Sequence, residues 1–160
     1  MSAHLPALVI LIPLVAAFLI LIGALLDKRL AFPLTALSLL GTLLASIGSL
    51  IRVIQVGVLE YHMAGWPPPV GIGLRLDHLS ALVLVAVTTV AFINVLGTRP
   101  LVADTFSDRL GPFYTLYVLL ITGLLGMVAT GDAFNLYVLL EIAALTGYAL
   151  VGMGEGRAPL

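Results

Sequence analysis

The sequence predicts an all-α polytopic membrane protein, with about five transmembrane helices and an outward-facing hairpin loop between helices 2 and 3. Hydrophobic residues make up 61% of the 160 positions and charged residues only 9%, whereas a soluble domain carries about 25% charged residues. Apolar runs of about 20 residues, the length that crosses a hydrocarbon core, recur along the chain. We expect residues 1–160 to form a single membrane domain in contact with the lipid bilayer.

The first two predicted spans are joined by a tight turn that contains Lys28 and Arg29. The first covers residues 5–26 and contains Pro13, whose kink a neighbouring helix can accommodate. The second covers residues 30–56, and its small side chains recur partly at four-residue spacing, which favours close helix packing.

The segment 57–76 is apolar but cannot form a spanning helix, because it contains the run Pro67–Pro69. We expect short extended pieces over 58–63 and 70–76, joined as a hairpin-like loop.

Three further spans are predicted over residues 77–96, 111–130 and 132–153. Asp77 and Asp132 stand where a side-chain oxygen can accept the free N–H groups of a helix start, so we expect both to be N-caps. The polar stretch 97–110 is expected to be a loop.

The distribution of positive charge predicts the topology. Five spans place the chain ends on opposite sides, and one side would carry Lys28, Arg29, Arg99, Arg109 and Arg157. The other side would carry Arg75, with Arg52 near a helix end. By the positive-inside rule the first side is cytoplasmic. We therefore expect a multi-pass protein of the cell (inner) membrane, with the N-terminus outside and the C-terminus cytoplasmic.

Composition also excludes several classes of function. A net charge of −1 provides no basic surface for nucleic acid. Without cysteine there are no disulfides, iron–sulfur clusters or zinc thiolates. No nucleophile–base pair, metal-ligand spacing or phosphate-binding loop is found, so we expect no cofactor, no metal and no catalysis by this chain alone.

The strongest candidate for function is Glu141, a carboxylate in the middle of the last span. At 1.5 Å per residue it lies roughly 12–14 Å past a helix start at Asp132, close to the midplane of the membrane. An ionised carboxylate at that depth costs at least ~2.5 kcal/mol and is a functional candidate by default. We interpret Glu141 as a proton relay; the alternative is a structural carboxylate hydrogen-bonded to neighbouring helices.

Four further residues are candidates for an ion pathway. Tyr137 and Tyr148 share a helix face with Glu141. Asp132, if it does more than cap the helix, would stand at the mouth of the path, next to Thr130. A relay of this kind needs a cation within the membrane, but the only lysine, Lys28, lies in a loop. Either another chain supplies the cation or the carboxylate acts without one.

Two separated stretches resemble the antiporter-like subunit family, which includes Mrp-type cation/proton antiporters, membrane-bound hydrogenases and respiratory complex I. One is TGDAFNLYVLLEIAALTGYALVG, which resembles the fourth and fifth helices of that family. The other is WPPPVGIGLRLDHLSALVLV, which resembles the junction of hairpin and third helix, most closely in the Mrp D subunit. In the family the glutamate of the first motif is the proton-relay carboxylate, and Glu141 matches it.

The resemblance covers only the N-terminal portion of such a subunit. It implies partners among other membrane subunits, including a chain that supplies the remaining antiporter helices and a membrane lysine. The sequence leaves open whether the chain is a natural split subunit or a truncation.

Two main hypotheses follow. In the first, the chain is part of a multisubunit antiporter, or of an antiporter-like module in an energy-converting redox complex, and Glu141 contributes to H⁺ or Na⁺ translocation. In the second, the chain is a structural scaffold that anchors neighbouring membrane subunits and has no ion path. A third alternative is a small transporter that oligomerises to build its own path. The ion, the host complex and the energy source are left open.

Overall fold

The computed structural model describes residues 4–66 and 71–155, and five long helices dominate it. They are α1 (Leu5–Leu26), α2 (Ala31–Val56), α3 (His78–Gly97), α5 (Leu110–Ala129) and α6 (Ala133–Glu155). All five are long and apolar enough to cross a membrane. The predicted class, an all-α polytopic membrane protein, is therefore confirmed. Helix α1 continues through Pro13, as expected for a proline packed against neighbouring helices.

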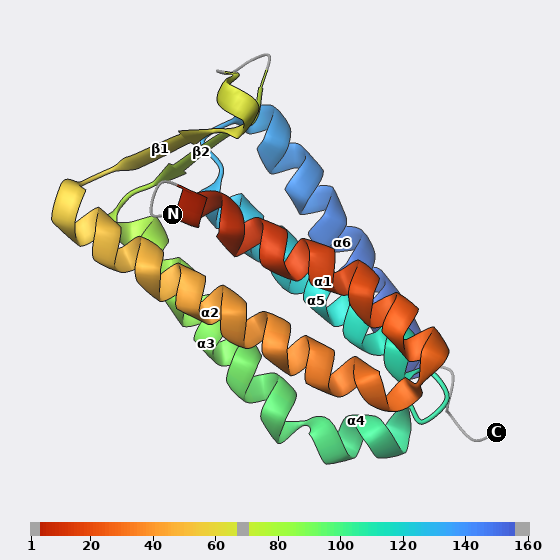
Figure 1. Ribbon diagram of the computed structural model, residues 1–160. Helices are drawn as coiled ribbons and strands as arrows, with labels where there is room; N and C mark the ends of the chain where they lie inside the picture. Colours follow the sequence, from red (N-terminus) through yellow and green to blue (C-terminus); the bar gives the residue numbers. More distant parts are fainter. Residues whose placement is uncertain (1–3, 67–70, 156–160) are drawn as a thin grey trace.

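The long helices lie side by side as a bundle (Figure 1). Helix α5 is central, since it packs against α1, α2, α3 and α6. Helix α2 packs against α1 and α3, which completes a four-helix group. Helix α6 packs against α5 and makes at most marginal contact with the other long helices. It is therefore the peripheral member of the bundle.

A two-stranded hairpin covers one end of the bundle, near the start of α1 (Figure 1). Strands β1 (Leu59–His62) and β2 (Gly73–Leu76) pair antiparallel, and the short 3₁₀ helix η3 (Met63–Gly65) follows β1. The backbone N–H of Gly131 donates to the carbonyl oxygen of Gly73 at 2.9 Å, which ties the hairpin to the turn before α6. Both strands are shorter than the predicted extended pieces, and residues 67–70 lie outside the described residues.

The predicted loop over 97–110 is wrong in part, because it contains the helix α4 (Arg99–Thr105). Pro100 stands in its first turn, where a missing N–H costs no hydrogen bond. Val102 is buried in the core and anchors the helix to the bundle. A polar composition concealed this short helix, since tertiary packing rather than propensity stabilises a segment of that length.

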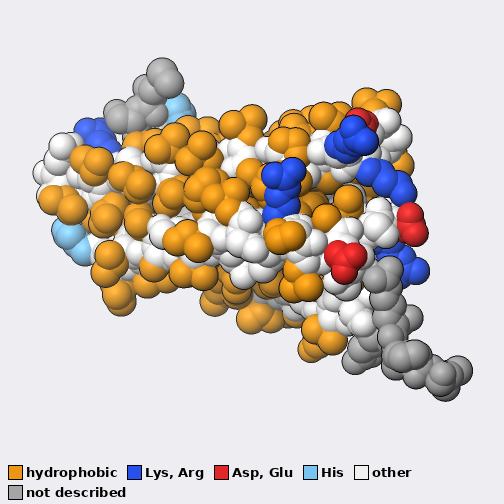
Figure 2. Space-filling model, turned by 90° about the horizontal axis from the view of Figure 1, so that it is seen from below, with side chains coloured by type: hydrophobic (Ala, Val, Ile, Leu, Met, Phe, Trp, Pro, Cys, Tyr) orange, Lys and Arg blue, Asp and Glu red, His pale blue; other side chains and the backbone are white. Residues whose placement is uncertain are grey.

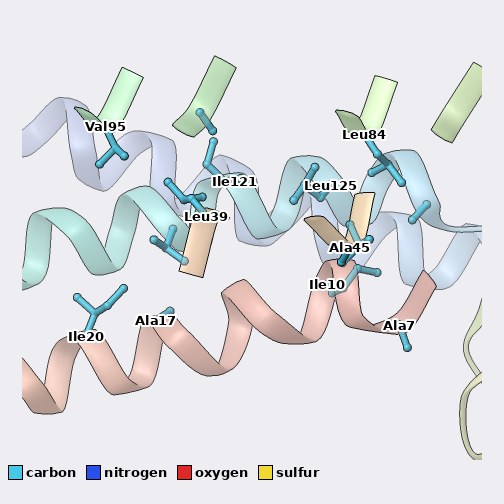
Figure 3. Close-up of a cluster of buried hydrophobic side chains, with 14 of the residues drawn as sticks. Ala7, Ile10, Ala17, Ile20, Leu39, Ala45, Leu84, Val95, Ile121 and Leu125 are labelled. Carbon is cyan, nitrogen blue, oxygen red and sulfur yellow. The ribbon is translucent and has the colours of Figure 1, made fainter. Parts of the chain in front are cut away.

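The hydrophobic core lies between α1, α2, α3 and α5 (Figure 3). Ile20, Leu39 and Leu125 are fully buried there and come from three different helices. The buried hydroxyl groups of Thr42 and Ser46 in α2 donate to backbone carbonyls four residues earlier, whereas that of Ser38 has no partner in the described chain. The first two hydroxyl groups are therefore satisfied within their own helix, as is usual for threonine and serine in membranes.

Hydrophobic side chains cover much of the face shown in Figure 2. On the face shown there, the acidic side chains gather at one end of the molecule. Leu37, Phe18 and Val90 are all more than half exposed although they lie within spanning helices. Such a surface suits lipid or other membrane helices and not water.

Candidate functional site

Glu141 lies inside helix α6, one of the five candidate membrane spans. It is about 12 Å along the axis from the first residue, Ala133, at 1.5 Å per residue. Among the described residues it is the one acidic side chain within the five candidate spans. The side chain is partly buried.

One face of α6 is held against α5. The buried residues of α6 form a single stripe at helical spacing: Asn135, Leu139, Ala143 and Thr146. A Cβ added to Gly123 of α5 would come within 2.9 Å of the backbone nitrogen of Ala143 and of the carbonyl oxygen of Leu139. Glycine at that position therefore lets the two backbones approach closely, as small residues do in membrane helix pairs.

Glu141 lies on the opposite face. It is two residues from both Leu139 and Ala143, which places it about 200° around the helix axis from each. The neighbours on its face are strongly exposed: Phe134 74%, Tyr137 62%, Leu145 64% and Tyr148 76%. The carboxylate therefore points away from the bundle, between aromatic and aliphatic side chains that no described element covers.

No cation pairs with Glu141 within residues 4–66 and 71–155. Lys28 is bound to Asp108 at 3.2 Å, in a solvent-exposed ion pair. Arg52 belongs to α2, which makes at most marginal contact with α6, and its buried Nε has no hydrogen-bond partner in the described chain. Neither side chain therefore provides a counter-charge for Glu141.

Tyr137 and Tyr148 share the face of Glu141, one turn before it and two turns after it. Thr130 and Asp132 lie at the helix start instead, about 13 Å or more along the axis from Glu141. The two tyrosines therefore share the helix face of the carboxylate, whereas the other two candidates lie in the turn before the helix.

Thr130 and Asp132 organise the turn between α5 and α6. The Oδ1 atom of Asp132 accepts from the backbone N–H of Phe134 at 3.0 Å, which confirms the predicted cap. The hydroxyl oxygen of Thr130 accepts from the Asp132 N–H at 3.3 Å and from Nδ2 of Asn135 at 3.0 Å. The sequence analysis did not identify Asn135. It could have been found as an amide four residues before Leu139, on the same helix face as the residues that contact α5.

The sequence relatives are named as subunits of an oxidoreductase and of antiporters. The chain is 38% identical to NADH-quinone oxidoreductase subunit N of Desulforudis audaxviator, over 99% of this chain and 32% of that protein. It is 34% identical to a putative antiporter subunit of Staphylococcus haemolyticus, over 97% of this chain and 30% of that protein. The chain thus spans about a third of the length of these curated relatives. No family model matches it.

Two solved structures share the fold. One is the membrane-bound sulfane sulfur reductase, an archaeal respiratory membrane complex, with a TM-score of 0.76 and 30% identity over 91% of this chain and 30% of that chain. The other is the Mrp complex from a Dietzia species, with a TM-score of 0.76 and 24% identity over 99% of this chain and 29% of that chain. At that identity the second likeness concerns the fold alone.

Proposed function

We propose that this chain, a homologue of the antiporter-like membrane subunits over about a third of their length, contributes Glu141 to H⁺ or Na⁺ translocation in a larger membrane complex. The observation that carries the proposal is a carboxylate that, among the described residues, is the one acidic group inside a candidate span and lies on a face of α6 that they leave uncovered. The likeness to subunits of an NADH-quinone oxidoreductase and of antiporters supports it.

The chemistry follows from the cost of charge in a low dielectric. Burial disfavours an ionised carboxylate, whereas a cation close by favours it. A cation that approaches and withdraws therefore makes the carboxylate release and take up a proton. Acidic groups in membrane spans serve this purpose in proton relays. Tyr137 and Tyr148 supply hydroxyl groups along the same face, where a proton or a hydrated ion would pass.

The uncovered face of α6 also indicates where the partner lies. Phe134, Leu145 and Tyr148 form an apolar border around Glu141, and an unpaired membrane charge generally faces a bundle interior. We propose that further antiporter helices cover this face and supply a membrane lysine. In the proposed orientation the hairpin and the N-terminus face outward, since Lys28, Arg29, Arg99 and Arg109 flank the opposite ends of the spans.

The test is a transport assay on the intact complex in inverted membrane vesicles. Glu141→Gln removes the titratable group at nearly constant volume and should reduce pH-gradient-driven cation exchange to background. Glu60→Gln is the matched control, because it makes the same substitution at an exposed position of the hairpin. Glu141→Asp keeps an acid and should retain part of the exchange. Wild-type exchange in Glu141→Gln would refute the proposal.

A structural scaffold is the second candidate, and the lack of a cation next to Glu141 in the described chain favours it. In that case Glu141→Gln would leave exchange unchanged but weaken the attachment of neighbouring subunits. The subunit stoichiometry of the purified complex, measured for the same two glutamine variants, separates the two functions.

A further inference from the structure

We propose that a basic pocket at the end of the bundle opposite the hairpin binds the phosphate of an anionic phospholipid. The pocket has a volume of about 330 Å³ and lies where the turn after α1, the starts of α2 and α5, and helix α4 come together. In Figure 1 this is the end at which α4 crosses the bundle. It is separate from the uncovered face of α6 and does not depend on the proposed role of Glu141.

Three cationic side chains line the pocket: Lys28, Arg29 and Arg99. They come from two connections that lie far apart in the sequence. Lys28 also binds Asp108, but that pair is 58% and 88% exposed and therefore weak. Arg29 and Arg99 enter no ion pair within the described parts of the chain. The pocket thus has an excess of positive charge, and the guanidinium groups of Arg29 and Arg99 can donate hydrogen bonds to an anion.

Two aromatic residues shape the inner wall. The guanidinium carbon of Arg99 lies 4.4 Å from the ring centre of Phe32, a cation–π contact that restrains the guanidinium at the pocket. Tyr114 also lines the pocket, and its hydroxyl makes no hydrogen bond within the parts of the chain that the structure describes. A phosphate oxygen in the pocket would supply the acceptor that the Tyr114 hydroxyl lacks.

The depth of the pocket favours a lipid over a free anion. Lys28 and Arg29 follow the end of α1, and Arg99 follows the end of α3, so their charges stand at the level of the lipid headgroups. Leu25 and Leu26, 81% and 82% exposed, lie beside them on the membrane side and would contact acyl chains. Basic pockets between membrane helices at this level recognise acidic lipid headgroups.

The experiment measures lipid binding to the purified full chain, with any co-purifying subunits, by native mass spectrometry. The probes are dioctanoyl phosphatidylglycerol, dioctanoyl phosphatidylcholine and inorganic phosphate. Phosphatidylglycerol should bind and phosphatidylcholine should not compete. Arg29→Gln with Arg99→Gln should weaken binding on the order of tenfold, since each cation near the surface contributes to the attraction. Restoring the charge with lysine at both positions should recover most of it.

Two further variants keep the test decisive. Arg109→Gln removes a charge at the same end of the bundle but outside the pocket lining, and it should change binding less than twofold. Tyr114→Phe removes only the hydroxyl, so it should weaken lipid binding without lowering the melting temperature of the lipid-free protein. The proposal is overturned if Arg109→Gln weakens binding as much as the double variant, or if phosphatidylcholine competes equally. Competition by inorganic phosphate at equal concentration would also overturn it, because the pocket would then take a free anion.

Discussion

Helices α5 and α6 have the same mean hydropathy, 1.8 over their most apolar windows, but opposite positions in the fold. Half of the α5 window is buried within the chain, compared with 17% of the α6 window. Hydropathy therefore reports that a helix can cross the membrane, not what surrounds it. With equal hydropathy, α5 lies at the centre of the bundle and α6 at its periphery.

The polar groups of the two helices show what the difference means. In α5, the Thr122 hydroxyl donates to the carbonyl oxygen of Val118 at 2.8 Å and needs nothing else. In α6, Glu141 has no partner of this kind within the described chain, because its face points away from α5. A carboxylate cannot be satisfied by its own helix backbone, which offers it no free N–H in mid-helix. The peripheral helix therefore carries the group that requires a partner.

The largest expected effect concerns the contact that joins the two helices. Gly123→Val should destabilise the chain by about 2–3 kcal/mol, because the new side chain meets backbone atoms of α6 that cannot move aside. Gly147→Val is the matched control, since a Cβ there has no heavy atom within 4 Å. Thermal unfolding in mild detergent, followed by circular dichroism, measures both. Equal destabilisation would show that the close approach of α5 and α6 is not required.

A smaller effect is expected in the turn that starts α6. Thr130→Val and Asn135→Ala each remove one side of a partly buried hydrogen bond of 3.0 Å, at a cost of about 1 kcal/mol. The double variant should cost less than the sum of the two, because the second change removes a group already left unpaired. Unfolding of the single and double variants measures this coupling; strictly additive losses would contradict it.

The outer face of α6 predicts a graded effect on exchange. Tyr137→Phe should reduce cation exchange partially, and less than Glu141→Gln, because the ring is kept and only one hydroxyl on the proposed path is lost. Tyr117→Phe is the control: its hydroxyl donates to the carbonyl oxygen of Ala91 at 3.0 Å, between α3 and α5. The two variants should differ in initial exchange rate at equal expression. Identical rates would remove Tyr137 from the path.

The smallest expected effect is a pH dependence at the start of α3. The backbone N–H of Ser80, followed by its side chain, lowers the pKa of Asp77 below its ordinary value of 3.8. Because the pKa is lowered, the charged cap stabilises the fold at pH values above the ordinary pKa. This stabilisation is lost as the pH falls through the lowered pKa. Asp77→Asn should therefore lower the melting temperature slightly at neutral pH and not in strong acid.

The control for this cap is Asp104→Asn, an exposed change within α4. It should shift the melting temperature equally at both pH values. A pH-independent difference for Asp77→Asn as well would show that its ionisation does not contribute. The start of α3 would then depend on the hydrogen bonds of its capping box and not on the charge of Asp77.

Much of the fold could be predicted because it depends on local composition and length. The predicted span 5–26 coincides with α1, and the last span, 132–153, differs from α6 by one residue at its start and two at its end. The position of Glu141 in the interior of the last long helix followed from the length of its apolar run. The caps Asp77 and Asp132 followed from residue type and position. Helix α4 could not be predicted, because burial of Val102 in a distant core stabilises it.

The sequence by itself determined that the chain spans a membrane, and it placed one acid in mid-span beside two tyrosines, since hydropathy and helix periodicity are local properties. Only the tertiary structure decided which way that acid points, because the outward face of α6 is set by the backbone contact with Gly123 of α5. The tertiary structure alone also brought Arg29 and Arg99 together around Tyr114. Contacts between residues so far apart depend on how the helices pack, and no local pattern in the sequence records that.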